Sequence, residues 1–153
     1  MNLRTVNKMA AAWISGAALM MATGLAQATE TPAKLDGAAL ATADKVKELM
    51  GKGATVVDTR VANEYADSHI KGAINVPYKE KSAKAADFDA SQDSWDMSKI
   101  PADKGAHLVL YCNAGECWKS YKSAKMAVKA GYKNVYWFRG GMPEWKSKGF
   151  PTE

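Results

Sequence analysis

The segment LVLYCNAGECW, residues 108–118, decides how this chain folds and where its chemistry lies. Its first four residues are apolar or aromatic and partly β-branched, which is typical of a buried strand. Cys112 stands where that strand would end, and a short loop containing Gly115 leads from it into a helical pattern. A thiol in that position lies among backbone N–H groups and close to a helix N-terminus, and both favour the reactive thiolate form. We therefore expect an enzyme or a sulfur carrier that works through Cys112.

Apolar runs and helical spacing alternate on both sides of this segment. Strands are predicted at residues 54–57, 73–76, 107–111 and 134–138. Helices are predicted at residues 35–50, 61–68 and 120–130, with a short last helix around Trp145 after Gly140-Gly141. This alternation indicates an α/β fold with a small parallel sheet and helices on both faces. Active sites of such sheets lie at the carboxyl ends of the strands, so Asp58 and Cys112, which both end strands, are expected close together.

Residues 79–106 fit neither periodicity. The segment contains lysine-rich turns together with Phe88, Trp95 and Met97. We expect either a long loop with a helical turn or a cover over the site, because long loops in compact domains are often functional. A plain surface excursion is an equally good interpretation.

The N-terminus has the three parts of a secretory signal peptide. Arg4 and Lys8 give a positive start, residues 9–25 carry no charge, and Ala26-Gln27-Ala28 is a small-residue cleavage site. An uncleaved anchor is the alternative, but the uncharged stretch falls short of the roughly 20 apolar residues that a membrane span needs. We predict a signal peptide at residues 1–28, cleaved after Ala28, then a tether at 29–34 and one domain at 35–153. The mature protein would be periplasmic or secreted, with no stable membrane insertion.

Composition narrows the classes of partner and cofactor. The chain has 153 residues and a net charge of +5. The lysines that are densest at helical spacing are predicted to form a solvated face: Lys119, Lys122, Lys125 and Lys129. No nucleic-acid-binding motif accompanies them, so no nucleic-acid partner is expected. Two cysteines five positions apart do not make a disulfide scaffold or a usual zinc spacing, and His69 and His107 show no ligand pattern. We expect no metal and no cofactor.

Several motifs resemble those of a single-domain rhodanese, a family of sulfurtransferases. They cover nearly the whole chain after the signal peptide, in the family's order. They are VVDTR at 56–60 followed by Glu64 and Tyr65, HIKGAINVP at 69–77, YCNAG at 111–115, RGG at 139–141, Trp145, and GFP at 149–151. The resemblance implies the rhodanese α/β fold and a cysteine that carries sulfane sulfur as a persulfide.

The resemblance also implies roles for individual residues. Cys112 falls on the nucleophile. The loop whose N–H groups cradle the bound anion corresponds to Asn113, Ala114, Gly115, Glu116 and Cys117. Supporting positions are Asp58, Arg60, Trp118 and Lys119, and His69 falls on a histidine that serves the fold rather than catalysis. Gly115 suits a loop position with positive φ and an unobstructed N–H.

The loop departs from the family pattern in its charge. Many sulfurtransferases of this family carry Arg or Lys within or just after the loop, whereas this chain has Glu116, Cys117 and Trp118 before Lys119. A carboxylate beside an anion cradle opposes the binding of thiosulfate by repulsion between like charges. The Cys-x4-Cys-Trp form resembles a periplasmic subgroup of rhodanese-like proteins. Glu116 is read as an exposed carboxylate in preference to a general acid or base.

Three interpretations of Cys117 stay open. It could be a resolving thiol that attacks an oxidised or persulfidated Cys112 and leaves a disulfide. It could form a resting disulfide that masks Cys112 until it is reduced, or it could pack as a small apolar residue. The oxidising compartment favours the two redox interpretations.

Three functions compete. The leading one is a sulfurtransferase or persulfide carrier that takes sulfur from a small donor or a protein and passes it to a thiol or another nucleophile. The second is a thiol–disulfide redox protein using both cysteines, and the third is a non-catalytic binding module with a partner surface at Trp95 and Trp118. A phosphatase with a cysteine-headed loop needs an arginine at the loop's end to clamp phosphate, and this loop has none.

Overall fold

Five parallel strands form the centre of the protein, whose structure is a computed structural model describing residues 30–153. The strands are β1 (Ala38–Leu40), β2 (Thr55–Asp58), β3 (Ile74–Asn75), β4 (His107–Tyr111) and β5 (Asn134–Phe138). They lie in the order β1-β5-β4-β2-β3, and every neighbouring pair is parallel. The α/β prediction with a parallel sheet is confirmed, while the predicted signal peptide at 1–28 lies outside the described residues.

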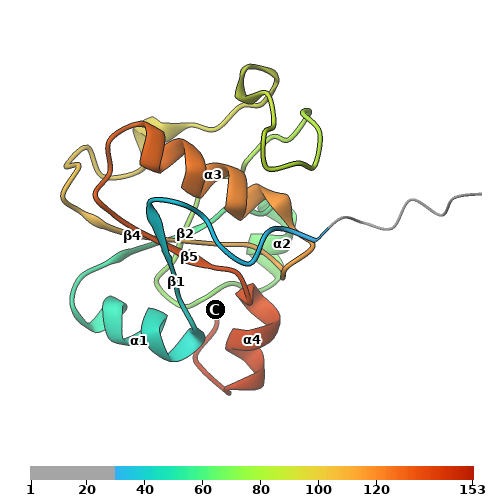
Figure 1. Cartoon of the computed structure of the whole chain (residues 1–153). Helices are drawn as coiled ribbons and strands as arrows, with labels where there is room; N and C mark the ends of the chain where they lie inside the picture. Colours follow the sequence, from blue (N-terminus) through green and yellow to red (C-terminus); the bar gives the residue numbers. More distant parts are fainter. Residues whose placement is uncertain (1–29) are drawn as a thin grey trace, which may run out of the picture.

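Helices cover both faces of the sheet, as predicted (Figure 1). On one face, α3 (Trp118–Lys129) packs on side chains such as Val57 and Leu110. On the other, α1 (Ala43–Gly51) and α4 (Gly141–Ser147) pack on side chains such as Val56 and Val109. Successive strand residues point to opposite faces, so each apolar strand supplies both cores.

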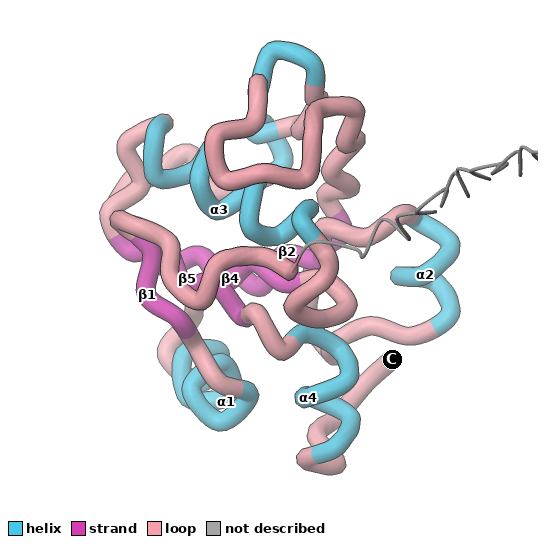
Figure 2. The backbone as a smooth tube through the Cα atoms, turned by 45° about the vertical axis from the view of Figure 1, so that its right-hand side comes forward, coloured by secondary structure: helices cyan, strands magenta, loops and turns pink. Residues whose placement is uncertain are grey.

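The fourth helix, α2 (Ala62–Asp67), has no buried residue and stands apart from these layers (Figure 2). It follows β2 directly, and an asparagine of the cysteine loop is hydrogen-bonded to it. The helix therefore belongs to the carboxyl edge of the sheet, where the site was predicted.

The prediction of one helix over residues 35–50 is wrong in its first part. Residues 38–40 form the edge strand β1, which pairs with β5, and the helix begins only at Ala43. Two local features account for the difference. Gly37 has a φ of +82°, which breaks a helix, and the Thr42 hydroxyl caps α1 by accepting a hydrogen bond from the Lys45 N–H at 3.3 Å.

Residues 79–106 form an irregular loop with two short 3₁₀ turns, at Ala90–Gln92 and Met97–Lys99. Trp95 and Ile100 from this segment are buried in the same core cluster as the side chains of α3. In Figure 1 the segment runs beside α3. It therefore lines the α3 side of the molecule rather than forming a separate lid.

Lys122 corrects the prediction that the lysines of α3 form a solvated face. Its side chain is completely buried, with Nζ 2.9 Å from Glu80 Oε2 and 3.7 Å from Asp93 Oδ2. Nζ also donates to Ser82 Oγ at 2.8 Å. The long loop brings two carboxylates against the helix, and a buried ammonium is tolerated when it is paired and hydrogen-bonded.

Asp93 predicts an acid-dependent loss of stability. Burial alone would raise its pKa, but the hydroxyl and N–H of Ser82, the N–H of Lys81 and the hydroxyl of Tyr78 all donate to it, and together they hold its pKa below the ordinary value. The unfolded chain therefore binds this proton more readily, so Asp93 stabilises the fold above about pH 4 and that stabilisation fades as the pH falls further. Between about pH 5 and pH 2, we expect the unfolding free energy of Asp93→Asn to fall less than that of the wild type, by on the order of 2 kcal/mol. Denaturant titrations across that range measure it, and Asp67→Asn, at an exposed carboxylate, should keep the wild-type slope.

Candidate active site

Cys112 follows the last residue of β4 and is only 2% exposed. Its carbonyl accepts a hydrogen bond from the Met142 N–H at 3.1 Å, at the start of α4. Gly141 lies against the same carbonyl, since a Cβ at this position would be 2.2 Å from the Cys112 oxygen, and its φ is +55°. The sequence placed Gly140-Gly141 before a short last helix and within the RGG motif of the rhodanese resemblance. The pair also lets α4 begin directly against the backbone of the predicted nucleophile.

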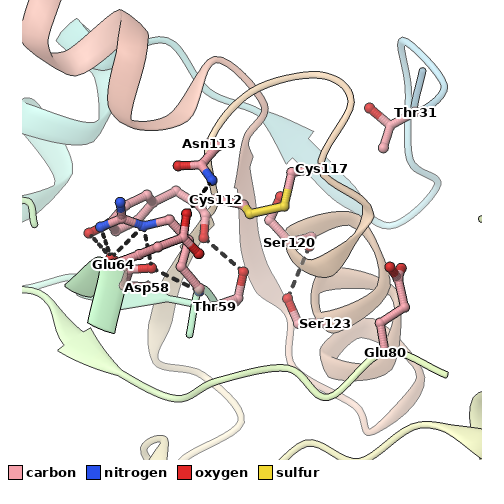
Figure 3. Close-up of a disulfide and its surroundings, with 12 residues drawn as sticks. Thr31, Asp58, Thr59, Glu64, Glu80, Cys112, Asn113, Cys117, Ser120 and Ser123 are labelled. Atoms are coloured by element: carbon pink, nitrogen blue, oxygen red, sulfur yellow. Dashed lines mark hydrogen bonds and ion pairs between the residues drawn. A yellow bond between two sulfur atoms is a disulfide. The ribbon is translucent and has the colours of Figure 1, made fainter. Parts of the chain in front are cut away.

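The two cysteines are joined by a disulfide that closes the loop (Figure 3). Their Cα atoms are 6.2 Å apart. Cys117 is the residue preceding α3, and its N–H donates to the Ala114 carbonyl at 3.0 Å. Both cysteines of the chain are thus engaged with each other, an arrangement that the resting-disulfide and resolving-thiol interpretations both contain.

The other loop residues differ in exposure. Asn113 and Glu116 are exposed, whereas Ala114 and Gly115 are half-buried. The Asn113 amide donates to Glu64 Oε1 of α2 at 2.7 Å, which links the loop to the helix after β2. Sequence reasoning placed Glu64 in a family motif without foreseeing this contact.

Gly115 lies close to Arg139 and does not have the predicted backbone conformation. Its φ is not positive, so the expectation of a left-handed conformation is wrong. A Cβ on Gly115 would instead lie 2.9 Å from the guanidinium carbon of Arg139, the residue after β5. The loop has no arginine of its own, but a guanidinium from the neighbouring strand lies directly against it.

Asp58 and Arg60 form a buried pair at the end of β2. The Asp58 side chain is fully buried and accepts hydrogen bonds from Arg60 Nη2 at 2.6 Å and from the Tyr111 hydroxyl at 2.7 Å. Burial, followed by the Asp58 charge, raises the pKa of Tyr111 above its ordinary value. The Thr59 hydroxyl donates to the Tyr111 carbonyl at 2.9 Å. Since Tyr111 precedes Cys112, this network ties the end of β2 to the end of β4, and the two strand ends lie close together as expected.

Trp118 and Lys119 have different surroundings. Trp118 is 3% exposed and packs edge-on against Tyr121, so it serves the core. Lys119, in the first turn of α3, borders a cleft of about 480 Å³ that lies between the start of α2 and the segment after β3. Its other lining residues are Val61, Ala62, Pro77, Tyr78, Lys79 and Glu80.

Trp95 and Trp118, which were predicted to form the partner surface of a binding module, are not exposed. Trp95 is 7% exposed and donates its indole N–H to the Val76 carbonyl, and Trp118 is equally enclosed. Both rings are parts of one core cluster. A partner could not be recognised through these two side chains without opening the core.

Among the described residues there is neither a cluster that could hold a metal nor a helix that could cross a membrane. Within residues 30–153, no group of three or more His, Cys, Asp or Glu side chains is placed to hold a metal ion. The same residues contain no helix with the length and apolar character required to cross a bilayer.

His69 stacks on Tyr65, with ring centroids 3.6 Å apart, and its Nδ1 lies 2.8 Å from the Tyr65 carbonyl.

Known proteins share both the sequence pattern and this fold. Thiosulfate:glutathione sulfurtransferase of Saccharomyces cerevisiae is 29% identical over 109 residues, covering 69% of this chain and 76% of that protein. Thiosulfate sulfurtransferase 16, chloroplastic, of Arabidopsis thaliana is 26% identical over 106 residues, covering 69% and 85%. The crystal structure of a Bacillus halodurans protein matches with a TM-score of 0.57 at 20% identity, covering 76% of this chain and 77% of that one, which shows a common fold. A family model described as a rhodanese-like domain matches residues 42–148, and the chain therefore belongs to the rhodanese-like family.

Proposed function

We propose that this protein is a sulfurtransferase that carries sulfane sulfur as a persulfide on Cys112. The observation that carries the proposal is the place of Cys112, between the end of β4 and a short loop that leads into the N-terminus of α3. Such a place favours the thiolate over the thiol. Family membership and the two relatives named as sulfurtransferases support sulfur transfer as the general role.

The proposed cycle has two displacements. The Cys112 thiolate attacks the outer sulfur of the donor, the donor's sulfur–sulfur bond breaks, and the remainder of the donor leaves with the electron pair. An acceptor thiolate then attacks the outer sulfur of the Cys112 persulfide, and Cys112 departs as a thiolate. No general base is needed when the thiol is already ionised by the surrounding N–H groups. The protein is neither oxidised nor reduced over the cycle.

The disulfide would be a resting state in which Cys112 cannot attack a donor. Two equivalents of a small thiol, or one protein dithiol, would reduce it and themselves become a disulfide. Cys117 could also regenerate it by attacking the Cys112 sulfur of the persulfide and expelling hydrosulfide. An extracytoplasmic location, with the leader removed after Ala28, would make such a protected state useful, because that compartment is oxidising.

Glu116 bears on the choice of donor. Its exposed carboxylate belongs to the loop that would receive the anion, and like charge disfavours the thiosulfate dianion there. We propose that polysulfides or small-molecule persulfides are better donors than thiosulfate. The acceptor would be a small thiol or a thiol on a partner protein.

The disulfide also favours a second candidate, a thiol–disulfide redox protein that uses Cys112 and Cys117. In that case the two thiols would cycle with a partner dithiol and no sulfur atom would be carried. The two candidate functions use the same two cysteines. They differ in whether the protein gains the mass of a sulfur atom when it meets a donor.

Intact mass spectrometry tests the proposal. The mature chain from Thr29 is reduced, freed of reductant and incubated separately with thiosulfate, inorganic polysulfide and glutathione persulfide. We expect one added sulfur on Cys112, most completely in Cys117→Ser, where the persulfide cannot be resolved, and none in Cys112→Ser. If no donor adds sulfur to Cys117→Ser, persulfide chemistry is rejected. Loss of two hydrogens in the wild type, without added sulfur, would then favour the redox candidate.

A further inference from the structure

Thr31, from the segment that precedes the domain, lies against the outer side of the cysteine loop. Thr31 is only 3% exposed, although it belongs to the short tether before the domain. Its N–H and its hydroxyl both donate to the Gly115 carbonyl, at 2.8 Å and 2.6 Å. Figure 3 shows Thr31 on the side of the loop that faces away from the disulfide. Thr31, which is 84 positions from Gly115 in the sequence, thus holds the peptide group between Gly115 and Glu116.

Arg139 completes this contact. Its Nε donates to the Thr31 hydroxyl at 3.1 Å and its Nη2 donates to the Thr31 carbonyl at 2.9 Å. Nη2 also lies 3.4 Å from the Glu30 carboxylate. The guanidinium fills the place that a side chain on Gly115 would occupy. Arg139, Thr31 and Gly115 therefore form a chain of hydrogen bonds from the end of β5 to the middle of the loop.

These hydrogen bonds between Arg139, Thr31 and Gly115 determine the direction in which one N–H of the loop points. In a trans peptide the C=O and N–H groups point in opposite directions. Because the Gly115 carbonyl points to Thr31, the N–H of the next residue, Glu116, points away from Thr31, toward the side of the loop on which Figure 3 shows the disulfide. An N–H held in that direction stabilises negative charge on the Cys112 sulfur.

We infer that Thr31 and Arg139 are positioning residues that keep the loop N–H groups directed at Cys112 and so keep its thiol ionised. The inference deepens the proposed function and rests on Cys112 being its reactive thiol. It also gives the tether a role. Cleavage after Ala28, as predicted from the sequence, would leave both Glu30 and Thr31 in the mature protein, where they are part of the site.

The test measures the ionisation of the Cys112 thiol, independently of sulfur transfer. In the Cys117→Ser background, the rate of alkylation by iodoacetamide is followed against pH. Thr31→Val keeps the shape of the side chain but removes the hydroxyl that joins Arg139 to Gly115. We expect the apparent pKa of the Cys112 thiol to rise and the alkylation rate at pH 6 to fall about fivefold, because one of the two hydrogen bonds that Thr31 donates to the Gly115 carbonyl is lost together with the Arg139 Nε contact.

Arg139 variants separate positioning from simple charge. Arg139→Lys keeps the positive charge but cannot reach Thr31 with two nitrogens, so it should shift the alkylation profile in the same direction as Thr31→Val. Thr55→Val, which removes a hydroxyl at the opposite end of the sheet, should leave the profile unchanged. An unchanged profile in Thr31→Val, or an effect of Arg139→Gln that Arg139→Lys does not share, overturns the inference. Sulfur gain by Cys112 is measured separately, so failure of the proposed function would not be mistaken for failure of this one.

Discussion

Replacing Lys122 by methionine is expected to lower the free energy of unfolding by about 3–5 kcal/mol. The ammonium is completely buried between Glu80 and Asp93, and the Asp93 side chain is equally buried. Methionine fills a similar volume, so little packing is lost. The cost arises because removing the cation leaves carboxylates behind without their counter-charge. In a domain whose total stability is about 5–15 kcal/mol, this is a large share.

Urea denaturation followed by tryptophan fluorescence measures the effect. Lys129→Met is the matched control, because Lys129 lies in the last turn of the same helix and is exposed. It should change the unfolding free energy by less than about 0.5 kcal/mol. In the double variant Lys122→Met/Glu80→Gln one stranded charge is gone, and part of the loss should be recovered. A change in Lys122→Met no larger than that of Lys129→Met would mean that the ion pair does not hold the long loop to α3.

Lys122 also shows where sequence reasoning ends. Periodic patterns predicted the strands at 107–111 and 134–138 with their bounds, because each is an apolar run with a clear start and stop. The four lysines of α3, by contrast, look alike in the sequence. Lys122 can be buried because the loop of residues 79–106 brings the carboxylates of Glu80 and Asp93 to it, and no local pattern records that contact.

Some residues of the candidate site could likewise be predicted from local sequence patterns, and others could not. Cys112, Asp58 and Arg60 could be predicted because each follows or ends a strand within a family motif. Thr31 could not, since its contact with the loop joins residues 84 positions apart. The edge strand β1 was missed for a related reason: its three residues are largely exposed and become a strand only by pairing with β5.

The largest expected effect on activity belongs to Cys112→Ser. A serine hydroxyl is not ionised near neutral pH and cannot form a persulfide, so sulfur transfer from polysulfide to a small thiol should fall at least about a thousandfold, to the uncatalysed rate. Cyanide, which releases sulfane sulfur as thiocyanate, gives a colorimetric measurement with the same donor. The loop fold is expected to persist, since the Cys112 carbonyl contact with the Met142 N–H does not involve the thiol.

Cys117→Ser is the matched variant, because it removes the same disulfide but keeps the proposed nucleophile. In the cyanide assay, which contains no thiol, wild-type protein purified without reductant should be inactive until it is reduced, since both sulfurs are held in the bond. Cys117→Ser should be active at once and should gain nothing from reduction. If instead Cys117→Ser loses activity as completely as Cys112→Ser, both thiols take part in every turnover, and the redox candidate explains the site better than a persulfide carrier. The pair of variants therefore separates a disulfide that protects the nucleophile from a disulfide that is itself the chemistry.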